Sequence, residues 1–463
     1  SSSQSFPKVG YGFETRDANG DNNNVSLLGL PVENDWVLHG PYSDKSLIRN
    51  ALAYKLGKEL MEYAPRTRFV ELVLNGDYRG VYLLTEKIKR DKNRVDISRL
   101  NSDENDGDDL TGGYILKHDK FTASDGSFQL GFTSNYTPNL PGARKTDFLY
   151  HYPDPEDISI QQKNYIENYI DDLESALKSG DFDDPQQGYR NYIDVPSFIR
   201  FLFVNEISKN VDGYRLSTFM YKDKDSVNGK LKMGPVWDFN LGFGNANYCE
   251  GGPTSGWAFD FNRHCPNDYW VIHFWWDRLL QDSTFRNEMK EDWKILRSGV
   301  LSTEQVVGCI DSMVTLLDAA QVRNFQRWPV LREWIWPNDF IGGVYSVEID
   351  YLKNWVTDRL AWLDQAFEDL GKPPFNPGPY FDPKVYPNPF VHDVTFEYYI
   401  GPEQRVSILI YNSTGQLVAE LQDNSPELYA NKLEWTPNLA PGIYFYRVYL
   451  DDNLGATGKL IRQ

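Results

Sequence analysis

Two aspartates carry the clearest chemical signal in this sequence. Asp212 lies between an apolar helical run and a strand-like run, and Asp238 stands at the end of another strand-like run. Phosphoryl transfer needs one carboxylate to orient and deprotonate the acceptor hydroxyl and another to hold the metal on the phosphates. The alternative is structural, since aspartate is common in turns: Asp212 would cap a turn and Asp238 would be a buried, hydrogen-bonded carboxylate.

The elements around these aspartates have a definite order. A helix over Pro196–Ser208 leads into Asp212, and strands over Tyr214–Lys222 and Gly229–Trp237 then lead to Asp238, which is followed by Gly242. This order of aspartate, hairpin, aspartate and glycine is that of the catalytic elements in protein kinases. The hairpin would place both carboxylates on one side of a cleft.

The upstream region predicts strands around one helix. Strands are expected over Phe6–Arg16, Arg68–Lys87 and Gly112–Lys117, with a hairpin turn at Asn75-Gly76. A helix is expected from Ser43 or Asp44 to about Glu62. Further along, 155–180 reads as an amphipathic helix and 268–370 as almost entirely helical.

The composition changes sharply at a Pro/Gly-rich linker over 371–380. The segment that follows, 381–463, predicts only short alternating strands separated by turns, which is typical of a small β-sandwich. The expected strands are Val394–Tyr399, Arg405–Tyr411, Leu433–Thr436, Gly442–Leu450 and Gly458–Ile461.

A combination of motifs from residue 1 to about 370 resembles the CotH family of spore-coat-type atypical kinases. The motifs are Ser2–Lys8, Leu27–Pro31, Asp35–Leu38, Tyr42–Asn50, Asn75–Glu86 and Gly234–Asn240. The resemblance implies an α+β, kinase-like domain over 1–370. Its strand-rich N-lobe would span about 1–120 and its helical C-lobe about 121–370.

The same resemblance implies binding of ATP and a divalent metal, Mg²⁺ or Mn²⁺. By matching position, Asp212 would be the catalytic aspartate and Asp238 the metal ligand, with Asn240 as a helper. Ser217 stands where a kinase loop has a metal-binding asparagine, and its hydroxyl is a weaker ligand. Asn210 could substitute from the other side, so a kinase and an inactive, kinase-like binding protein both stay open.

Four further residues are assigned to nucleotide binding by element order. Lys8 would bind phosphate, with Lys117 as its rival, Glu86 would lie near a hinge that meets adenine, and Arg49 would serve phosphate or an internal ion pair. A structural or solvated role is the alternative for Lys8 and Arg49, as isolated cations usually have one.

The end of the chain looks like the C-terminal sorting domain of the type IX secretion system. The similarity rests on Tyr386–Phe390, Val406–Tyr411, Leu439–Arg447 and Gly458–Ile461. It implies engagement of the secretion machinery, export from a Gram-negative cell, and release or anchoring at the outer surface. The alternative is an ordinary immunoglobulin-like accessory module.

Two smaller features concern metals and thiols. Asp17, Asn19 and Asp21 alternate oxygen side chains as in the start of a Ca²⁺ loop, although a solvated turn explains them equally. Cys249 and Cys265 flank one loop and suit a disulfide in an oxidising compartment, with two free thiols as the alternative.

Charge and composition exclude several classes of protein. The formal net charge of −19 argues against nucleic-acid binding, which needs clustered Lys and Arg. No apolar run is long enough for a transmembrane helix, and the six histidines show no zinc-enzyme spacing. The start at Ser1 suggests a mature or trimmed chain.

Two functions therefore compete. The first is an exported, ATP-dependent kinase-like enzyme that phosphorylates protein hydroxyls. The second is a non-catalytic surface protein that binds a glycan or a protein partner through an aromatic cleft, for which the Trp-rich loop 257–276 is the candidate.

Overall fold

The protein is described from a computed structural model. The described residues are 6–120, 130–138, 140, 142–227, 229–370, 383–398, 405–423, 431–450 and 453–463. The linker expected over 371–380 lies outside them, as does the start of the first CotH-like motif. The chain forms two compact units, the larger comprising Ser1–Tyr136, Arg144–His273 and Glu288–Phe367, and the smaller Thr137–Ala143, Phe274–Asn287 and Glu368–Gln463.

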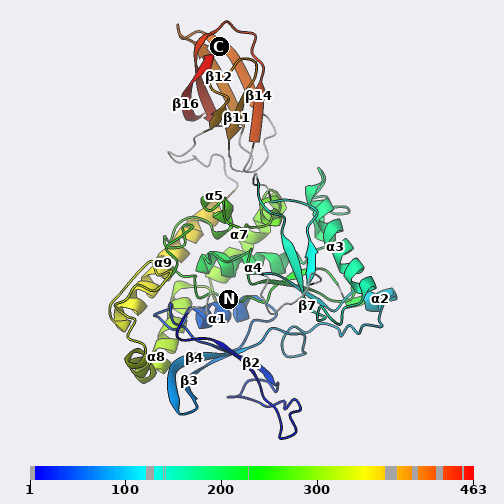
Figure 1. Cartoon of the computed structure of the whole chain (residues 1–463), viewed down its shortest axis with the longest axis vertical. Helices are drawn as coiled ribbons and strands as arrows, with labels where there is room; N and C mark the ends of the chain where they lie inside the picture. Colours follow the sequence, from blue (N-terminus) through cyan, green and yellow to red (C-terminus); the bar gives the residue numbers. More distant parts are fainter. Residues whose placement is uncertain are drawn as a thin grey trace. The chain divides into compact units, whose positions relative to one another are not determined.

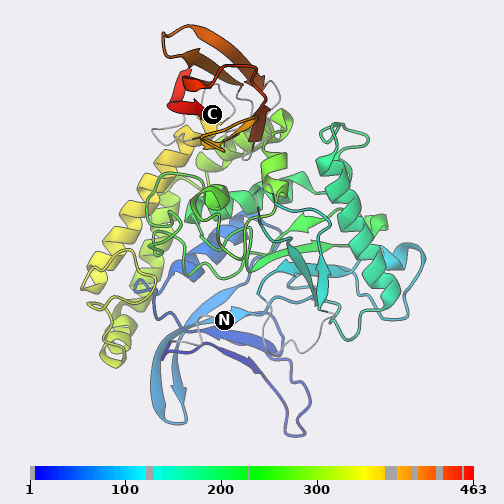
Figure 2. The same ribbon diagram turned by 45° about the horizontal axis from the view of Figure 1, so that its top comes forward.

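The larger unit begins with an antiparallel sheet in the order β1-β2-β4-β3. Its strands are β1 (Tyr11–Glu14), β2 (Asp35–His39), β3 (Thr67–Leu74) and β4 (Asp77–Glu86). The predicted hairpin is confirmed, since Asn75 and Gly76 both have positive φ, as its tight turn requires. Figures 1 and 2 show this sheet at one end of the unit, with α8 (Thr303–Arg327) and α9 (Tyr345–Asp369) on one flank and α3 (Ile160–Lys178) on the other.

A second antiparallel sheet has the order β6-β7-β5-β8-β9. Its strands are β5 (Tyr114–His118), β6 (Gly131–Thr133), β7 (Asp147–Tyr152), β8 (Thr218–Lys222) and β9 (Lys232–Met233). The last two are shorter than predicted. β8 starts only at Thr218 because Tyr214 and Ser217 have positive φ, and β9 ends at Met233 because Gly234 has φ 113° and Pro235 has no N–H to pair.

The helices α1 (Arg49–Leu60) and α4 (Val195–Ser208) contact each other inside the larger unit. α1 begins later than predicted because the Asp44 carboxylate accepts the backbone N–H groups of Ser46 and Arg49 and so holds the preceding residues in a turn. α4 begins at a cap in which Asp194 accepts the N–H of Ser197. Nearly every side chain of α4 is buried, which gives the residues that follow it a rigid support.

The remaining helices complete the mixed α+β architecture that the sequence predicted. The region over 268–370 is helical as expected, but residues 328–344 break it, and they include Pro329 and Pro337. The other helices are α7 (Ser283–Arg297) and the short α2 (Gly107–Leu110), α5 (Phe261–His264) and α6 (Trp275–Leu279), with single 3₁₀ turns at Tyr189–Asn191, Asp225–Val227 and Ala258–Asp260.

The C-terminal part of the smaller unit is rich in strands, as predicted. One sheet has the order β10-β11-β14 and another β13-β12-β15-β16, and both contribute to one core, in which Phe396 contacts Tyr446. The strands are β10 (Lys384–Tyr386), β11 (Val394–Tyr398), β12 (Val406–Asn412), β13 (Leu417–Asp423), β14 (Asn431–Trp435), β15 (Gly442–Leu450) and β16 (Asn453–Arg462). The sequence analysis missed β10 and β13.

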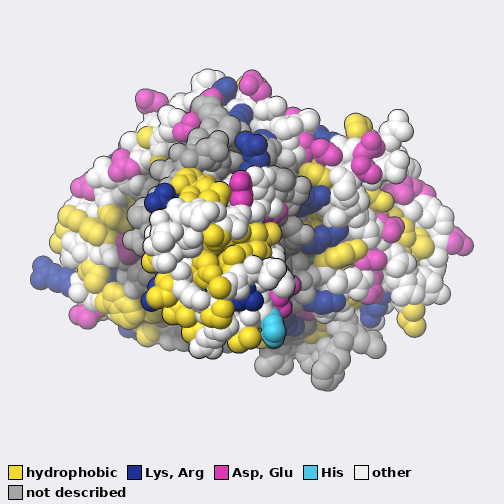
Figure 3. All heavy atoms as spheres, turned by 90° about the horizontal axis from the view of Figure 1, so that it is seen from above, with side chains coloured by type: hydrophobic (Ala, Val, Ile, Leu, Met, Phe, Trp, Pro, Cys, Tyr) yellow, Lys and Arg dark blue, Asp and Glu magenta, His cyan; other side chains and the backbone are white. Residues whose placement is uncertain are grey.

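The strand-rich part also exposes large apolar side chains. Leu417, Ile443 and Phe445 are each close to half exposed. Figure 3 looks onto this unit and shows hydrophobic side chains gathered near the centre of the view.

A buried ion pair joins distant parts of the larger unit. Glu206 on α4 and Arg359 on α9 meet at 3.1 Å, and both side chains are fully buried. Burial raises the pKa of Glu206 and lowers that of Arg359 to about 10, while their mutual attraction opposes both shifts. Glu206 also accepts hydrogen bonds from the Tyr214 hydroxyl and from the N–H groups of Ala258 and Phe259, which compensates for its lost hydration.

We expect Arg359→Met to lower the free energy of unfolding by about 3–5 kcal/mol, because it leaves the Glu206 carboxylate buried without its counter-ion. Urea unfolding followed by tryptophan fluorescence measures the change. The control is Arg323→Met, whose ion pair with Glu71 is exposed and is worth about 1 kcal/mol or less. Equal losses in the two variants would contradict the prediction.

Candidate functional site

The loop that carries Asp212 is fixed at both ends. Lys209 ends α4 in the left-handed conformation, with φ 44°. The Asn210 side chain accepts the N–H of Asp212 at 3.3 Å, and the Asp212 carbonyl accepts the N–H of Leu216 at 3.0 Å. Tyr214 is bound to Glu206 in the core, so the Asp212 backbone has little freedom.

Arg215 is the direct partner of Asp212. Its Nη2 lies 2.8 Å from Asp212 Oδ1 and its Nη1 lies 3.1 Å from Asp268 Oδ1, while its guanidinium group packs 4.0 Å from the centre of the Phe261 ring. The Arg215 side chain is 3% exposed and that of Asp212 is 22% exposed. The Asp212 carboxylate is therefore partly exposed to solvent, and the buried Arg215 guanidinium group fixes its position.

The loop that carries Asp238 is anchored by α1. The Asp238 N–H donates to the Tyr54 hydroxyl at 3.2 Å, and the Phe239 N–H donates to the Asn50 side chain at 2.6 Å. Asp238 has φ 61°, a conformation that costs energy for a residue with a side chain and is found disproportionately at functional sites. Surrounding contacts thus hold Asp238 in a position that the chain alone would not favour.

The charge of Asp212 acts on Asp238. Burial raises the pKa of Asp238 to about 7, with the negative charges of Asp212 and Asp119 adding to the rise and Lys120 opposing it. Burial also raises the pKa of Asp212, against the attraction of Arg215 and Lys120. A carboxylate whose pKa neighbouring carboxylates raise, as Asp212 and Asp119 do for Asp238, would be stabilised by a divalent cation.

Asp119 belongs to this acidic group, and the sequence analysis missed it. It directly follows β5, where it lies 3.5 Å from Lys117. The β5–β8 register pairs His118 with Thr218, so its continuation places Asp119 opposite Ser217. The available signal was an aspartate immediately after the strand that the sequence did predict.

Oxygen ligands for a metal are present in this region. Asp238, Asp119, Ser217 and Asn240 are all partly exposed, and the Asn240 carbonyl oxygen accepts a hydrogen bond from Asn245. Among the described residues, no three His, Cys, Asp or Glu side chains converge to hold an ion. The donor set nevertheless fits Mg²⁺, which proteins commonly bind through one or two carboxylates together with waters and substrate phosphates.

Three of the four expected nucleotide residues have internal partners. Lys8 Nζ lies 2.8 Å from Asn324 Oδ1, and burial lowers its pKa to about 7. Arg49 pairs with Asp44 at 2.6 Å, where both are buried, and it also donates to the Phe243 carbonyl oxygen on the Asp238 loop. Glu86 pairs with Arg66.

Lys117 differs, because its ion pair with Asp119 places it beside the acidic group. The structure therefore brings Asp212, Asp238 and Lys117 to one region.

The expected calcium residues form a turn. Asp17 Oδ1 accepts the N–H groups of Asn19 at 2.8 Å and Asp21 at 3.0 Å, and the three residues are exposed. This carboxylate oxygen is thus engaged by the turn itself, as in the solvated-turn alternative. Calcium binding here stays a prediction.

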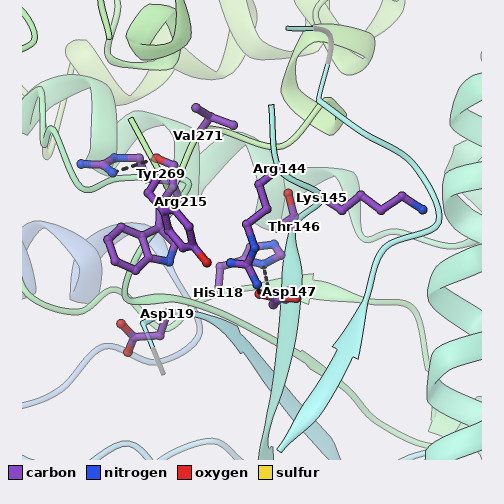
Figure 4. Close-up of a pocket in the computed structure, with 10 residues that line it drawn as sticks. His118, Asp119, Arg144, Lys145, Thr146, Asp147, Arg215, Tyr269 and Val271 are labelled. Carbon is purple, nitrogen blue, oxygen red and sulfur yellow. Dashed lines mark hydrogen bonds and ion pairs between the residues drawn. The ribbon is translucent and has the colours of Figure 1, made fainter. Parts of the chain in front are cut away.

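The disulfide between Cys249 and Cys265 is confirmed, with 5.6 Å between the Cα atoms. It links the segment that follows the Asp238 loop to the Trp-rich loop. Within that loop, Tyr269 is 58% exposed and Trp270 accepts a hydrogen bond from Arg215 through its carbonyl oxygen. The Trp-rich loop therefore lies beside Asp212, where its aromatic side chains line a pocket with Arg144 and Asp119 (Figure 4).

Fold and site together define a mixed α+β protein with aspartates on two braced loops beside a sheet. The family model described as CotH kinase protein matches residues 1–363, which is more than half of the chain. The chain belongs to the CotH kinase protein family. A second model, described as secretion system C-terminal sorting domain, matches residues 384–463.

The sorting domain is of the type IX kind, so the secretion machinery is a partner and the chain is destined for the cell surface or the extracellular space. In the described part of the chain, no helix has the length and apolar character needed to cross a bilayer.

Similarities to solved structures are slight. Dimeric latent PorU from Porphyromonas gingivalis is 23% identical over 18% of this chain and 9% of its own, with a TM-score of 0.16. The Pseudomonas fluorescens alkylpurine DNA glycosylase AlkC, bound to DNA containing an abasic site analogue, is 11% identical over 44% of this chain and 59% of its own, with a TM-score of 0.14. Neither likeness carries an argument about function. No curated protein sequence matched the chain.

The raised pKa of Asp238 predicts a pH dependence of stability in the presence of a chelator. The folded chain holds this proton more tightly than the unfolded chain, so the free energy of unfolding falls as pH rises from about 4 to about 7. Asp238→Asn cannot titrate and is expected to be more stable than the wild type at pH 8, with a smaller difference at pH 4. Each unit of the Asp238 pKa shift that the substitution removes contributes about 1.4 kcal/mol to this difference in the free energy of unfolding.

Urea unfolding at pH 4, 6 and 8 measures this dependence, with Asp318→Asn on the exposed face of α8 as the control. A difference between wild type and Asp238→Asn that is the same at all three pH values would show that Asp238 ionises normally.

Proposed function

We propose that this exported protein is a kinase-like enzyme that binds ATP with Mg²⁺ or Mn²⁺ and transfers a phosphoryl group to a protein hydroxyl. The supporting observation is the pair of aspartates, Asp212 and Asp238, which stand on the two loops that flank β8 and β9, with the charge of Asp212 adding to the raised pKa of Asp238. In this proposal the N-terminal sheet with α1 forms a kinase-like N-lobe, and the helical remainder of the larger unit forms the C-lobe.

Each aspartate has a distinct role in the proposal. Asp212 accepts the proton of the acceptor hydroxyl, and its pairing with Arg215 keeps it oriented and favours the ionised form that a base needs. Asp238 holds the metal, with Asn240, Ser217 and Asp119 as further oxygen ligands. The metal, when bound, neutralises charge on the transferred phosphoryl group.

Cations near the acidic group are suited to phosphate. Lys117 pairs with Asp119, and the charge of Lys120 acts on Asp238, so one of these lysines can bind a phosphate oxygen once a metal occupies the carboxylates. Lys8, Arg49 and Glu86 keep their proposed roles by element order alone. Their internal partners favour the structural alternative, in which Arg49 supports the Asp238 loop from α1.

The central experiment is isothermal titration of the full chain with ATP and Mg²⁺ or Mn²⁺. Wild type is expected to bind ATP only with metal. Asp238→Ala is expected to weaken this binding by about 100-fold or more, since even the loss of an indirect partner of a metal ligand costs about 10- to 100-fold. Asp318→Ala, an exposed aspartate on α8, is the matched control. Absence of metal-dependent binding in wild type would overturn the proposal.

A second experiment separates chemistry from binding. Asp212→Asn is expected to bind ATP and metal like the wild type but to transfer labelled phosphate about 100- to 10,000-fold more slowly, the usual contribution of a general base. Transfer from γ-labelled ATP into the chain itself and ATP hydrolysis are the readouts. Transfer at the wild-type rate would exclude Asp212 as the base.

A non-catalytic binding function is the second candidate, and one observation favours it. Trp334 and Trp336 are 54% and 44% exposed, and Trp336 stacks on Tyr248 with the rings 14° from parallel. The charge of Asp212 contributes to the raised pKa of Tyr248, so this aromatic pair borders the candidate site. Wild type that fails to bind ATP but binds an oligosaccharide or a protein partner through Trp336 would establish this second function.

A further inference from the structure

A polar pocket in the larger unit has no ligand assigned above. It is lined by residues at the end of β5, before and at the start of β7, on the Asp212 loop and on the Trp-rich loop, among them His118, Asp119, Arg144, Arg215, Tyr269 and Trp270. Figure 4 shows Arg144 directed toward His118 and Asp147, whereas Lys145 points away from the other labelled side chains.

The pocket adjoins the proposed base. Arg215 lines the pocket and donates from Nη2 to Asp212 Oδ1 at 2.8 Å. Asp119 also lines it, and its charge acts on both Asp212 and Asp238. A group held in the pocket is therefore a neighbour of any hydroxyl that Asp212 would deprotonate.

Cations gather here in a chain whose net charge is −19. Arg144 lies 4.8 Å from the centre of the Tyr269 ring and pairs with Asp147 at 2.5 Å. Lys120 lies 4.9 Å from the centre of the Trp270 ring, and within the described residues it has no ion pair. Aromatic faces stabilise cations at such distances and so hold them in place.

A buried donor also lacks an acceptor. Among the described residues, Trp270 Nε1 has no hydrogen-bond partner although it is shielded from solvent. The backbone of Trp270 is fixed, because its N–H donates to Asp268 Oδ1 at 2.9 Å and its carbonyl oxygen accepts from Arg215 at 2.8 Å. An oxygen atom from a ligand would satisfy this N–H group, whose burial is otherwise unfavourable.

The ring geometry favours an anion over a sugar ring as the occupant. The rings of Tyr269 and Trp270 meet at 75° with their centres 4.7 Å apart, so they form a corner and no flat platform. A cation lies over a face of each ring. A carboxylate suits this corner, because its oxygens can accept from the guanidinium group of Arg144 and from an indole N–H, while Lys120, which lies over the Trp270 ring, is just outside the lining of the pocket.

We propose that this pocket is the acceptor subsite and binds an acidic side chain of the acceptor polypeptide next to the serine or threonine that is phosphorylated. The inference rests on the proposed function. The inference specifies the substrate class, which is a polypeptide whose serine or threonine is flanked by glutamate or aspartate.

Two synthetic peptides test the proposal by titration into the full chain, first without nucleotide and then with ATP and metal. Both contain a single serine, which is flanked by glutamates in one peptide and by glutamines in the other. The acidic peptide is expected to bind wild type about tenfold more tightly, as expected for charge-assisted hydrogen bonds to a carboxylate.

The preference is expected to fall to about threefold or less in Arg144→Gln and in Trp270→Phe, which keeps the ring but removes the N–H donor. The matched control is Arg323→Gln, another ion-paired surface arginine. Thermal melting of each variant distinguishes a lost contact from a lost fold, and Arg144→Lys is expected to restore part of the preference.

Equal affinity for the two peptides, or a preference that survives in both pocket variants, would overturn the proposal. Binding of a uronic-acid oligosaccharide with neither peptide bound would overturn the choice of a polypeptide. A preference that is lost in the pocket variants, in a protein that binds no ATP, would confirm the acidic-peptide site and refute its role in phosphoryl transfer.

Discussion

The arrangement of the larger unit depends on one buried interaction, the pairing of Glu206 with Arg359. Arg359 donates to the Glu206 carboxylate and also to the carbonyl oxygens of Glu206, Thr254 and Gly256. Glu206 in turn holds Tyr214 on the Asp212 loop. One pair of charges thus fixes α9 against α4, sets the path of the Asp212 loop and orients the segment that leads to the Trp-rich loop.

The two aspartate loops are braced in different ways, and this suits their different tasks. Asp212 is held through its side chain by Arg215, a partner that stays charged at any physiological pH. Asp238 is held through its own backbone N–H group and that of the next residue, which donate to Tyr54 and Asn50. Among the described residues, no cation pairs with the Asp238 carboxylate as Arg215 does with Asp212. The first arrangement suits a base that must stay oriented, and the second suits a ligand that awaits a positive ion.

The sequence was informative wherever local chemistry decides the outcome. The Asn75-Gly76 hairpin, the helix α4 and the two aspartates in their loops follow from turn residues and periodicity, which are properties of neighbouring residues. The Cys249–Cys265 link was one of two alternatives that spacing allowed. Strand β9 is shorter than expected because Gly234 and Pro235 end it, and β10 was missed because it is only three residues long.

The remainder of the site could not be read from the sequence because it depends on contacts between residues far apart in the chain. Asp119 joins Asp212 and Asp238 through the register of β5 against β8, which no local pattern encodes. The partners of Lys8 and Glu86, which are Asn324 and Arg66, lie 316 and 20 residues away, so element order alone could not identify these internal contacts.

The disulfide determines in which compartment the site can reach its final rigidity. By tying Cys249 to Cys265 across 16 residues, it restricts the segment that joins the Asp238 loop to the loop bearing Trp270, a constraint worth about 3 kcal/mol in chain entropy. A reducing cytoplasm would keep Cys249 and Cys265 as free thiols. Inside the cell the chain would therefore lack this constraint, and the walls of the site would gain their final rigidity only after the protein has left the compartment in which it was made.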